Sequence, residues 1–281
     1  MTRILAALFV MIGVSLAQAE EQHMTIPAQP PMPEAAETGM AEVNGIAMYY
    51  ALYGDAGDTP ILMIHGGLAH ADIWAAQVAD LSADYRVIVA DTRGHGRSTN
   101  DGSAYSYERL AADYLALLDH LEVDKVHLVG WSDGANIGFA ISATAPERLA
   151  SHFAHAGNVT LSGIDPSVET NEVFGAYVGM MGADYAKLSP TPDGFEAFLG
   201  GVATMWGTEK SGGMEALESF TVPTLIVQSE HDEAILMQHS RDIAAAIPRA
   251  GHLVLKDVSH FALFQAPDAY TQAIRSFVEA Q

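Results

Sequence analysis

VHLVGWSDGANIGFAISATA, residues 126–145, is the stretch of sequence that decides the fold of this chain. The apolar run 126–129 predicts a buried strand, and residues 135–145 predict a helix. Between them lies the pattern G-x-S-x-G, in the strand–turn–helix context that gives it meaning. The two glycines let strand and helix approach closely, so we expect Ser132 to be strained and exposed at the tip of the turn. Its hydroxyl then points out of a sheet, at the positive end of the helix dipole.

Apolar runs and helical spacings alternate on both sides of this stretch. Strands that alternate with helices predict a mostly parallel sheet of eight strands with helices on both faces, an α/β fold. Asn44-Gly45 predicts a hairpin that gives the sheet an antiparallel edge. The expected strands are 41–43, 46–52, 60–64, 85–90, 126–129, 149–156, 224–228 and 253–258, and the expected helices are 71–81, 107–121, 135–145, 237–246 and 268–279.

Residues 157–219 interrupt the alternation. The segment is rich in Gly, Met, Tyr and Phe and has no clear strand, yet it lies between two strand–helix units. It is best interpreted as an inserted helical lid. The predicted core is then built from residues 41–156 and 220–281. A length of 281 residues fits one such domain, and the absence of cysteine means that the fold does not depend on disulfides.

The N-terminus resembles a bacterial secretory signal. Arg3 supplies a positive charge, residues 4–16 are apolar but too short to span a bilayer comfortably, and residues 17–19 form an A-x-A cleavage site. We expect residues 1–19 to be removed, which predicts a periplasmic or secreted protein with no stable membrane anchor; an uncleaved anchor is the alternative. The proline-containing stretch 20–40 is expected to be a flexible leader outside the fold.

The chain is strongly acidic, with a formal net charge of −22. Removal of residues 1–19, which contain one arginine and no acid, brings the charge to about −23. Such a charge argues against nucleic acid or anionic membranes as partners. It favours solubility or a saline habitat, and it leaves a weak attraction of cationic substrates open.

Two further residues complete a candidate acyl-transfer site with Ser132. This chemistry needs a nucleophile, a base and a group that orients the base. His260 follows the last expected strand, and Asp232 follows the strand before it. Glu230 or Glu233 remains an alternative to Asp232, and a histidine before a C-terminal helix is often only a cap or a surface residue. The joint order Ser, Asp, His, with each residue after a strand, favours the catalytic assignment.

An oxyanion needs two backbone N–H groups aimed at it. One is expected from Asp133, the residue after the nucleophile, and the other from the loop after strand 60–64. In that loop Gly67 and Leu68 are both candidates, with Gly67 favoured, and His65 is expected to hold the loop by hydrogen bonds.

These motifs together resemble the α/β-hydrolase fold superfamily, of the serine-hydrolase type. The resemblance covers about residues 41–281, and the G-W-S-D-G turn is similar to the biphenyl-hydrolase-like or valacyclovirase-like branch. It implies the α/β-hydrolase fold and the triad Ser132, Asp232 and His260. The matching segments are His65-Gly66-Gly67, Asp91-Thr92-Arg93-Gly94-His95-Gly96-Arg97-Ser98, Gly130-Trp131-Ser132-Asp133-Gly134 and Ser259-His260, of which the D-x-R-G-x-G-x-S segment is usually a structural loop in the family.

Two departures from the family pattern bear on the chemistry. Ala135 stands where the branch often has a second glycine, and alanine is tolerated at a helix start. The serine at 132 speaks against epoxide hydrolases and haloalkane dehalogenases, which use aspartate there. The sequence contains no H-x-H-x-D-H or H-E-x-x-H motif and no G-x-G-x-x-G that opens a βαβ unit, so we expect neither a metal nor a nucleotide cofactor.

The expected substrate is a small molecule that enters beneath the lid. The bulky apolar residues of the lid either line a substrate pocket or simply pack the lid onto the body. Pocket linings rich in methionine tolerate substrates of varied shape. Asp133 is hypothesised to pair with a cationic group such as the amine of an amino-acid ester; the alternative is a carboxylate satisfied locally. The candidate substrate-binding residues are Trp131, Asp133, Tyr177, Met181, Trp206 and Phe261.

The sequence therefore predicts a serine hydrolase that cleaves carboxylic esters of small or medium, mainly apolar substrates through an acyl-enzyme. A lactonase, a carbon–carbon bond hydrolase and a cofactor-free perhydrolase share the same site and remain alternatives. A non-catalytic ligand-binding protein on the same fold is the alternative of another class. The sequence leaves the oligomeric state open.

Overall fold

The computed structural model describes residues 21–55, 57, 59–208, 210 and 213–281. The predicted signal peptide, residues 1–19, lies outside this range. Within the described residues, no helix is both long and apolar enough to cross a bilayer.

In the described part of the chain, eight strands form one central sheet in the order β1-β2-β4-β3-β5-β6-β7-β8. The pairs β1–β2 and β2–β4 are antiparallel, and every other neighbouring pair is parallel. The predicted mostly parallel α/β sheet is thus confirmed. The strands are β1 (Glu37–Val43), β2 (Ile46–Tyr53), β3 (Ile61–Ile64), β4 (Val87–Ala90), β5 (Val126–Trp131), β6 (Leu149–His155), β7 (Thr224–Ser229) and β8 (Ala250–Leu255).

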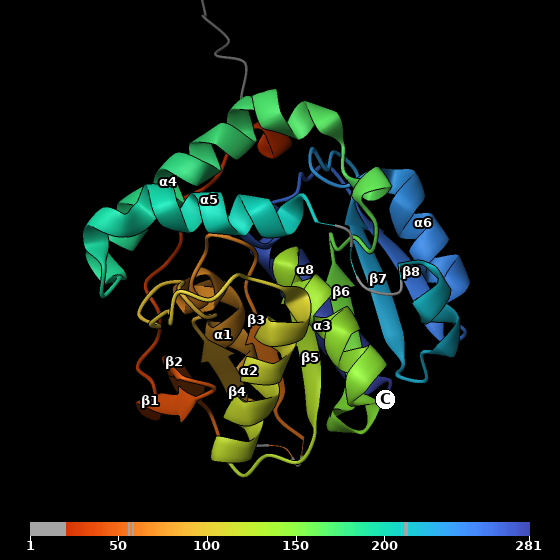
Figure 1. Ribbon diagram of the computed structural model, residues 1–281. Helices are drawn as coiled ribbons and strands as arrows, with labels where there is room; N and C mark the ends of the chain where they lie inside the picture. The colour runs from red at the N-terminus through yellow and green to blue at the C-terminus, as the bar shows by residue number, and fades with distance from the viewer. Residues whose placement is uncertain (1–20, 56, 58, 209, 211–212) are drawn as a thin grey trace, which may run out of the picture.

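Helices cover both faces of the sheet. In Figure 1, α2 and α3 lie in front of the central strands and α8 lies behind them. Helix α2 packs on α3, and α1 packs on α8. The helices are α1 (Ala75–Leu81), α2 (Tyr107–His120), α3 (Asp133–Thr144), α4 (Glu172–Leu188), α5 (Phe195–Trp206), α6 (Met237–Ala246), α7 (Ala262–Gln265) and α8 (Pro267–Glu279).

Local sequence explains why these elements form where they do. Helix α2 begins after Ser106, whose hydroxyl accepts a hydrogen bond from the amide of Arg109 as an N-cap. Its buried stripe has helical spacing, as predicted, and comprises Leu110, Tyr114, Leu117 and Leu118. The β1–β2 hairpin turns at Asn44 and Gly45, both at positive φ (44° and 82°), the conformation that a tight two-residue hairpin turn requires.

Two strands differ from the sequence expectation by three residues or more at one end or both. Strand β1 begins at Glu37, four residues before the predicted start, because Glu37 pairs with Leu52 across the hairpin. Strand β8 spans 250–255, whereas 253–258 was expected. Strand β8 pairs with β7 from Ala250, opposite Thr224, to Leu255, opposite Ser229. The sequence-based boundary began at the apolar residues 253–255, which form only the second half of the strand.

The segment before β1 packs against the body, which corrects the expected flexible leader. The ring of His23 stacks on His231 with centroids 3.9 Å apart, and Gln265 Nε2 donates a hydrogen bond of 2.8 Å to the carbonyl of Thr25. Ile26 and Met32 pack against the hydrophobic core. Ile26 and Met32 stand close in sequence to the prolines on which the expectation of a flexible leader was based.

The predicted helical insertion is present between β6 and β7. Figure 1 shows α4 and α5 crossing above the ends of the central strands. Helix α4 buries Tyr177, Met181 and Tyr185, and α5 buries Phe198 and Met205. The lid is therefore packed on the body through apolar side chains.

Candidate functional site

Ser132 stands alone between β5 and α3 in a conformation that few side chains adopt. Its backbone has φ 55° and ψ −116°, so the residue is strained. A Cβ on Gly134 would lie 2.0 Å from the carbonyl oxygen of Ile64, and one on Gly130 would lie 2.4 Å from the carbonyl oxygen of Gly134. Only glycine fits at these two positions, so the pentapeptide makes the sharp turn that its sequence predicts.

His260 and Asp232 form a buried pair. Asp232 Oδ1 lies 3.0 Å from His260 Nδ1, and the same oxygen accepts hydrogen bonds of 2.9 and 2.8 Å from the amides of Ala234 and Ile235. Burial alone would raise the pKa of Asp232, but His260 and the two amides outweigh it and hold this pKa below its usual value. The carboxylate is therefore ionised and fixed against the imidazole ring.

The pKa of His260 is shifted in the opposite direction. Burial alone would lower it, but the charge and hydrogen bond of Asp232, with smaller contributions from Glu233 and Asp133, raise the pKa of His260 above its usual value. Such surroundings favour the imidazolium, the form that a general base reaches after it accepts a proton.

The loop of His260 lies against the serine turn. Trp131 Nε1, on the residue before Ser132, donates a hydrogen bond of 2.8 Å to the carbonyl oxygen of His260. Among the described residues, the hydrogen bonds join His260 to Asp232, Glu233 and Trp131, and they do not join it to Ser132 itself. Ser132 remains partly exposed. Contacts of this kind often tighten only when substrate binds.

The loop after β3 approaches Ser132 from the other side. A Cβ on Gly66 would lie 3.2 Å from the Cβ of Ser132, and Leu68 adopts a positive φ of 67°. In the described part of the chain, no protein acceptor pairs with the amides of Gly67, Leu68 or Asp133. These three N–H groups are thus available to a ligand oxygen.

Both segments that carry these amides are held by the lid. Tyr177 of α4 donates a hydrogen bond of 2.6 Å from its hydroxyl to the carbonyl oxygen of Gly67. Trp206 of α5 donates one of 2.8 Å from Nε1 to Asp133 Oδ2. A Cβ on Gly67 would lie 2.5 Å from the Trp206 ring and 2.6 Å from Asp133 Oδ2. Lid, loop and turn therefore meet at one place.

The carboxylate of Asp133 is hydrogen-bonded within this junction, which favours the alternative of a locally satisfied carboxylate over pairing with a cationic substrate. Tyr107 donates a hydrogen bond of 2.7 Å to Asp133 Oδ1, while Trp206 occupies the other oxygen. Asp133 is only 6% exposed, and burial raises its pKa. Both oxygens are thus satisfied locally by side chains, and no sequence motif identifies those side chains.

The expected substrate-contacting residues divide into two groups. Trp131 and Phe261 are 1% and 0% exposed and pack on each other and on His260, so their direct contact with substrate is not supported by this structure. Tyr177 and Met181 of α4 are also buried, and Trp206 of α5 is partly buried. These three lid residues lie on the helices that cover the turn.

The loops that carry His65 and Arg93 are held by hydrogen bonds, as expected for structural loops. His65 donates from Nδ1 to the carbonyl of Gly66 and accepts at Nε2 from the amide of Thr92. Burial lowers the pKa of His65 to about 3, so the ring is neutral. Arg93 is buried and pairs with Asp113.

The structure separates the three acids of the 230–233 segment. Asp232 contacts the imidazole of His260, whereas Glu233 Oε2 accepts a hydrogen bond of 2.9 Å from the backbone amide of His260. Glu230 points away from the pair and binds Lys256 Nζ at 3.0 Å. Of the alternatives that the sequence left open, only Asp232 lies against the ring.

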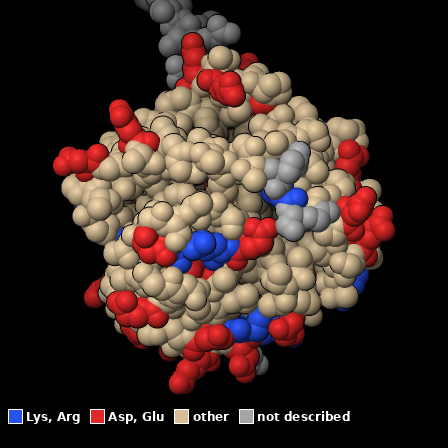
Figure 2. Space-filling view, in the orientation of Figure 1, with Lys and Arg blue, Asp and Glu red and all other residues tan. Residues whose placement is uncertain are grey.

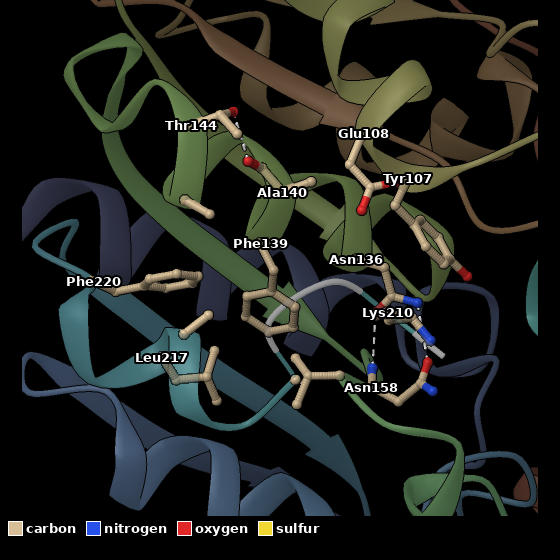
Figure 3. Close-up of a pocket in the computed structure, with 14 residues that line it drawn as sticks. Tyr107, Glu108, Asn136, Phe139, Ala140, Thr144, Asn158, Lys210, Leu217 and Phe220 are labelled. Carbon is tan, nitrogen blue, oxygen red and sulfur yellow. Dashed lines mark hydrogen bonds between the residues drawn. The ribbon is translucent and has the colours of Figure 1, made fainter. Parts of the chain in front are cut away.

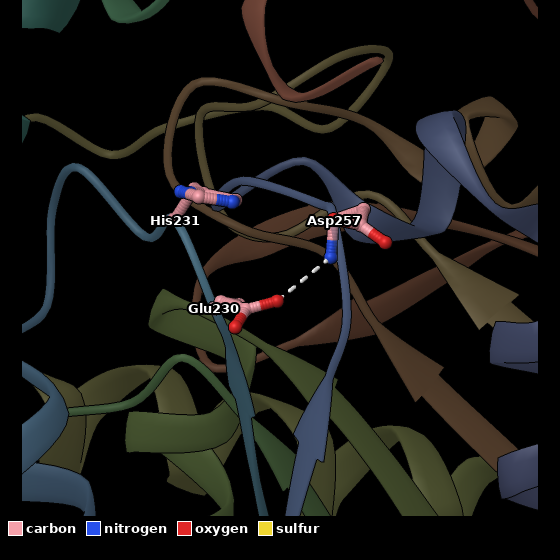
Figure 4. A group of neighbouring side chains, drawn as sticks. All are labelled: Glu230, His231 and Asp257. Atoms are coloured by element: carbon pink, nitrogen blue, oxygen red, sulfur yellow. Dashed lines mark hydrogen bonds between the residues drawn. The ribbon is translucent and has the colours of Figure 1, made fainter. Parts of the chain in front are cut away.

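One exposed group near this segment offers possible metal ligands. Glu230, His231 and Asp257 bring ligand atoms within 4.8 Å of one another (Figure 4). Glu230 already accepts hydrogen bonds from Lys256 and from the amide of Asp257, and all three residues are exposed. We assign no metal ion to this group.

Two hollows border the lid, and neither is lined by Ser132, Asp232 or His260. One of about 120 Å³ lies beside α3, with Asn136 and Phe139 on its walls (Figure 3). The other, of about 750 Å³, lies between α5 and the loop that follows β4.

Figure 2 shows acidic side chains scattered over the visible face, with few basic ones between them.

Comparison with known proteins agrees with this architecture. A family model described as alpha/beta hydrolase fold matches residues 59–197. The putative carbamate hydrolase RutD of Pseudomonas savastanoi pv. phaseolicola is 27% identical over 252 residues, which cover 80% of this chain and 95% of the relative. Esterase YbfF of Escherichia coli K12 is 24% identical over 242 residues, covering 79% of this chain and 93% of the relative.

Solved structures give the same result. The structure described as "Est816 as an N-Acyl homoserine lactone degrading enzyme" matches with a TM-score of 0.71 and 26% identity, over 85% of this chain and 99% of the other. Meta-cleavage product hydrolases share the fold as well, with TM-scores of 0.74 and 0.73 at 20% and 21% identity.

Proposed function

Because the chain belongs to the α/β-hydrolase fold superfamily, we propose that it is a serine hydrolase that cleaves carboxylic esters of small or medium, mainly apolar substrates. The observation that carries the proposal is the strained Ser132 at the end of β5, with the buried His260–Asp232 pair against its turn. An esterase and a carbamate hydrolase among the relatives support hydrolysis at a carbonyl group.

In the proposed reaction His260 accepts the proton of Ser132, and the serine oxygen attacks the ester carbonyl. The tetrahedral oxyanion lies against the amide of Asp133 and that of Gly67 or Leu68, which have no protein acceptor among the described residues. Collapse of this intermediate releases the alcohol and leaves an acyl-enzyme.

Water then attacks the acyl-enzyme with His260 as the base, and the acid product leaves. Asp232 holds the His260 ring in one tautomer, with Nδ1 protonated, so that Nε2 is free to take the proton. It also stabilises the imidazolium that forms, which agrees with the raised pKa of His260.

We propose an exported protein with a small-molecule partner, on the basis of the signal-like residues 1–19 and the net charge of −22. The acidic surface supports neither nucleic acid nor an anionic membrane as a partner.

The test is hydrolysis of a p-nitrophenyl ester series, acetate to decanoate, by residues 20–281 and by the same chain with Ser132→Ala. We expect the wild-type chain to hydrolyse at least the shorter esters and the variant to lose several orders of magnitude in turnover. The chain-length profile then measures the room beneath the lid. Equal rates for the two proteins would exclude Ser132 as the nucleophile.

A lactone or a carbamate is the second candidate substrate, because relatives of both kinds share the fold over most of this chain. The same triad would open a lactone through an acyl-enzyme. Assays with an N-acyl homoserine lactone and a simple carbamate, beside the ester series, rank the three by kcat/KM. If the wild-type chain is inactive in all three assays, a carbon–carbon bond hydrolase or a non-catalytic binding protein becomes the favoured function.

A further inference from the structure

A second acid lies beside the candidate base and has no part in the mechanism above. Glu233 directly follows Asp232, and its Oε2 accepts a hydrogen bond of 2.9 Å from the backbone amide of His260. The residue is only 9% exposed. His260 is therefore held at two points by neighbouring carboxylates, at its ring by Asp232 and at its backbone by Glu233.

Each of these acids also has an oxygen that no protein group satisfies. In the described part of the chain, neither Glu233 Oε1 nor Asp232 Oδ2 has a hydrogen-bond partner. A buried polar atom without a partner costs free energy. A cation beside the two acids offsets that cost, and the imidazolium of His260 is the cation that the proposed reaction creates there.

We propose that Glu233 is a positioning residue for the base: it fixes the backbone of His260 and places a second acid, after Asp232, beside the imidazole. This inference rests on the function proposed above. It deepens that function by assigning the base two acidic neighbours, of which only Asp232 touches the ring.

The titratable groups that interact with His260 in the described part of the chain include three acids and one histidine. Asp232 and Glu233 come from the loop after β7, Asp133 from α3 and His155 from β6. Burial lowers the pKa of His155 to about 3, so that ring is neutral. The three acids all raise the pKa of His260, in the order Asp232, Glu233, Asp133, against the lowering effect of burial.

Loss of the Glu233 charge should therefore lower the pKa of His260. Burial raises the pKa of Glu233 itself, while the nearby His260 opposes that rise. A substitution to glutamine keeps an oxygen that accepts from the amide of His260 and removes only the charge. A substitution to leucine removes both, so the two variants separate electrostatics from positioning.

Glu230 provides a matched control. It lies three residues earlier on the same loop, but its side chain is 35% exposed and is bound to Lys256. Solvent screens the charge of such a group, so Glu230→Gln should leave the base unchanged.

The experiment compares wild type, Glu233→Gln, Glu233→Leu and Glu230→Gln in two ways. The first is kcat/KM against pH on a p-nitrophenyl ester. The second is an NMR titration of histidine-labelled protein, in which the His260 signal is identified by its loss in His260→Gln. The titration needs no turnover, so it tests the role of Glu233 even if the proposed ester hydrolysis fails.

We expect Glu233→Gln to lower both the NMR pKa of His260 and the acid limb of the rate profile by about half a pH unit or more. Glu233→Leu should show the same shift and a further drop in kcat of about tenfold, because the His260 amide loses its acceptor. An unchanged His260 titration in Glu233→Gln, or an equal shift in Glu230→Gln, would overturn the proposal.

Discussion

The two halves of the candidate site are held in place by different parts of the molecule. In the acid–base half, Asp232 accepts hydrogen bonds from two amides of its own loop and pairs with His260. In the oxyanion half, the side chains of Tyr177 and Trp206 reach down from the lid to Gly67 and Asp133. The first half belongs to the core, and the second is shared between the core and the lid.

This difference has a functional consequence. A change in the lid should weaken the stabilisation of the oxyanion while the His260–Asp232 pair stays intact. A change in the loops after β7 and β8 should do the reverse. The lid then acts on the rate of the chemical step as well as on the shape of the substrate pocket.

The largest effect is expected from breaking the acid–base half with Asp232→Asn. The amide cannot hold the imidazole in the tautomer that accepts the proton of Ser132, so kcat should fall by about 10³- to 10⁴-fold. Ester hydrolysis by the purified variant measures it. Asp242→Asn, at an exposed position of α6, is the control and should keep full activity. A loss below about tenfold in Asp232→Asn would assign the orienting acid to another residue.

The oxyanion half should be weakened, but not abolished, by Tyr177→Phe and Trp206→Phe. Each removes one donor that holds an amide-bearing segment, so kcat should fall by about ten- to a hundredfold, less than for direct loss of an oxyanion donor. Tyr185→Phe is the matched control, because its hydroxyl bonds to Thr191 within the lid. The measurement is kcat of the three variants in steady-state ester hydrolysis. Equal kcat values in all three would show that Tyr177 and Trp206 do not position the oxyanion-binding amides.

The pH profile sharpens the comparison because the pKa of His260 is raised, whereas the pKa values of the buried His65 and His155 are lowered. The pKa of His260 is raised above its usual 6.5, chiefly by Asp232 against the effect of burial. The protonated ring cannot accept a proton, so kcat/KM should fall as the pH drops through a midpoint above 6.5. Burial keeps His65 and His155 neutral, with pKa values of about 3. A midpoint well below 6.5 in the wild-type chain would contradict this arrangement.

The smallest effect is expected at the N-terminal segment. His23→Ala removes the ring that stacks on His231, next to Asp232, but it touches neither half of the site directly. We expect a loss of less than about 1 kcal/mol in the free energy of unfolding and little change in kcat. Urea unfolding followed by fluorescence measures the first quantity. A large loss of activity would show that this segment supports the acid–base half.

The sequence predicted those parts of the site that depend on local pattern. The turn at Ser132 was predictable because Gly130 and Gly134 are required by close backbone contacts at fixed spacing. Asp232 and His260 were predictable because each follows a strand, and parallel strands bring such residues to one edge.

The contacts that the sequence did not predict join residues far apart in the chain. Tyr107 and Trp206 bind Asp133 from 26 and 73 residues away, and neither lies in a recognisable motif. Glu233 was visible only as an alternative to Asp232, since nothing in the sequence tells which acid meets the ring and which meets the backbone amide of His260. The N-terminal segment was missed because its partners, such as Gln265, lie at the other end of the chain.

Reaction with a fluorophosphonate probe, followed by peptide mapping, shows directly whether Ser132 is an activated nucleophile. We expect one covalent adduct, located on Ser132, that is absent in Ser132→Ala and forms much more slowly in Asp232→Asn. Failure of the native protein to react, or an adduct on a different residue, would contradict the assignment of Ser132 as a nucleophile activated by His260 and Asp232.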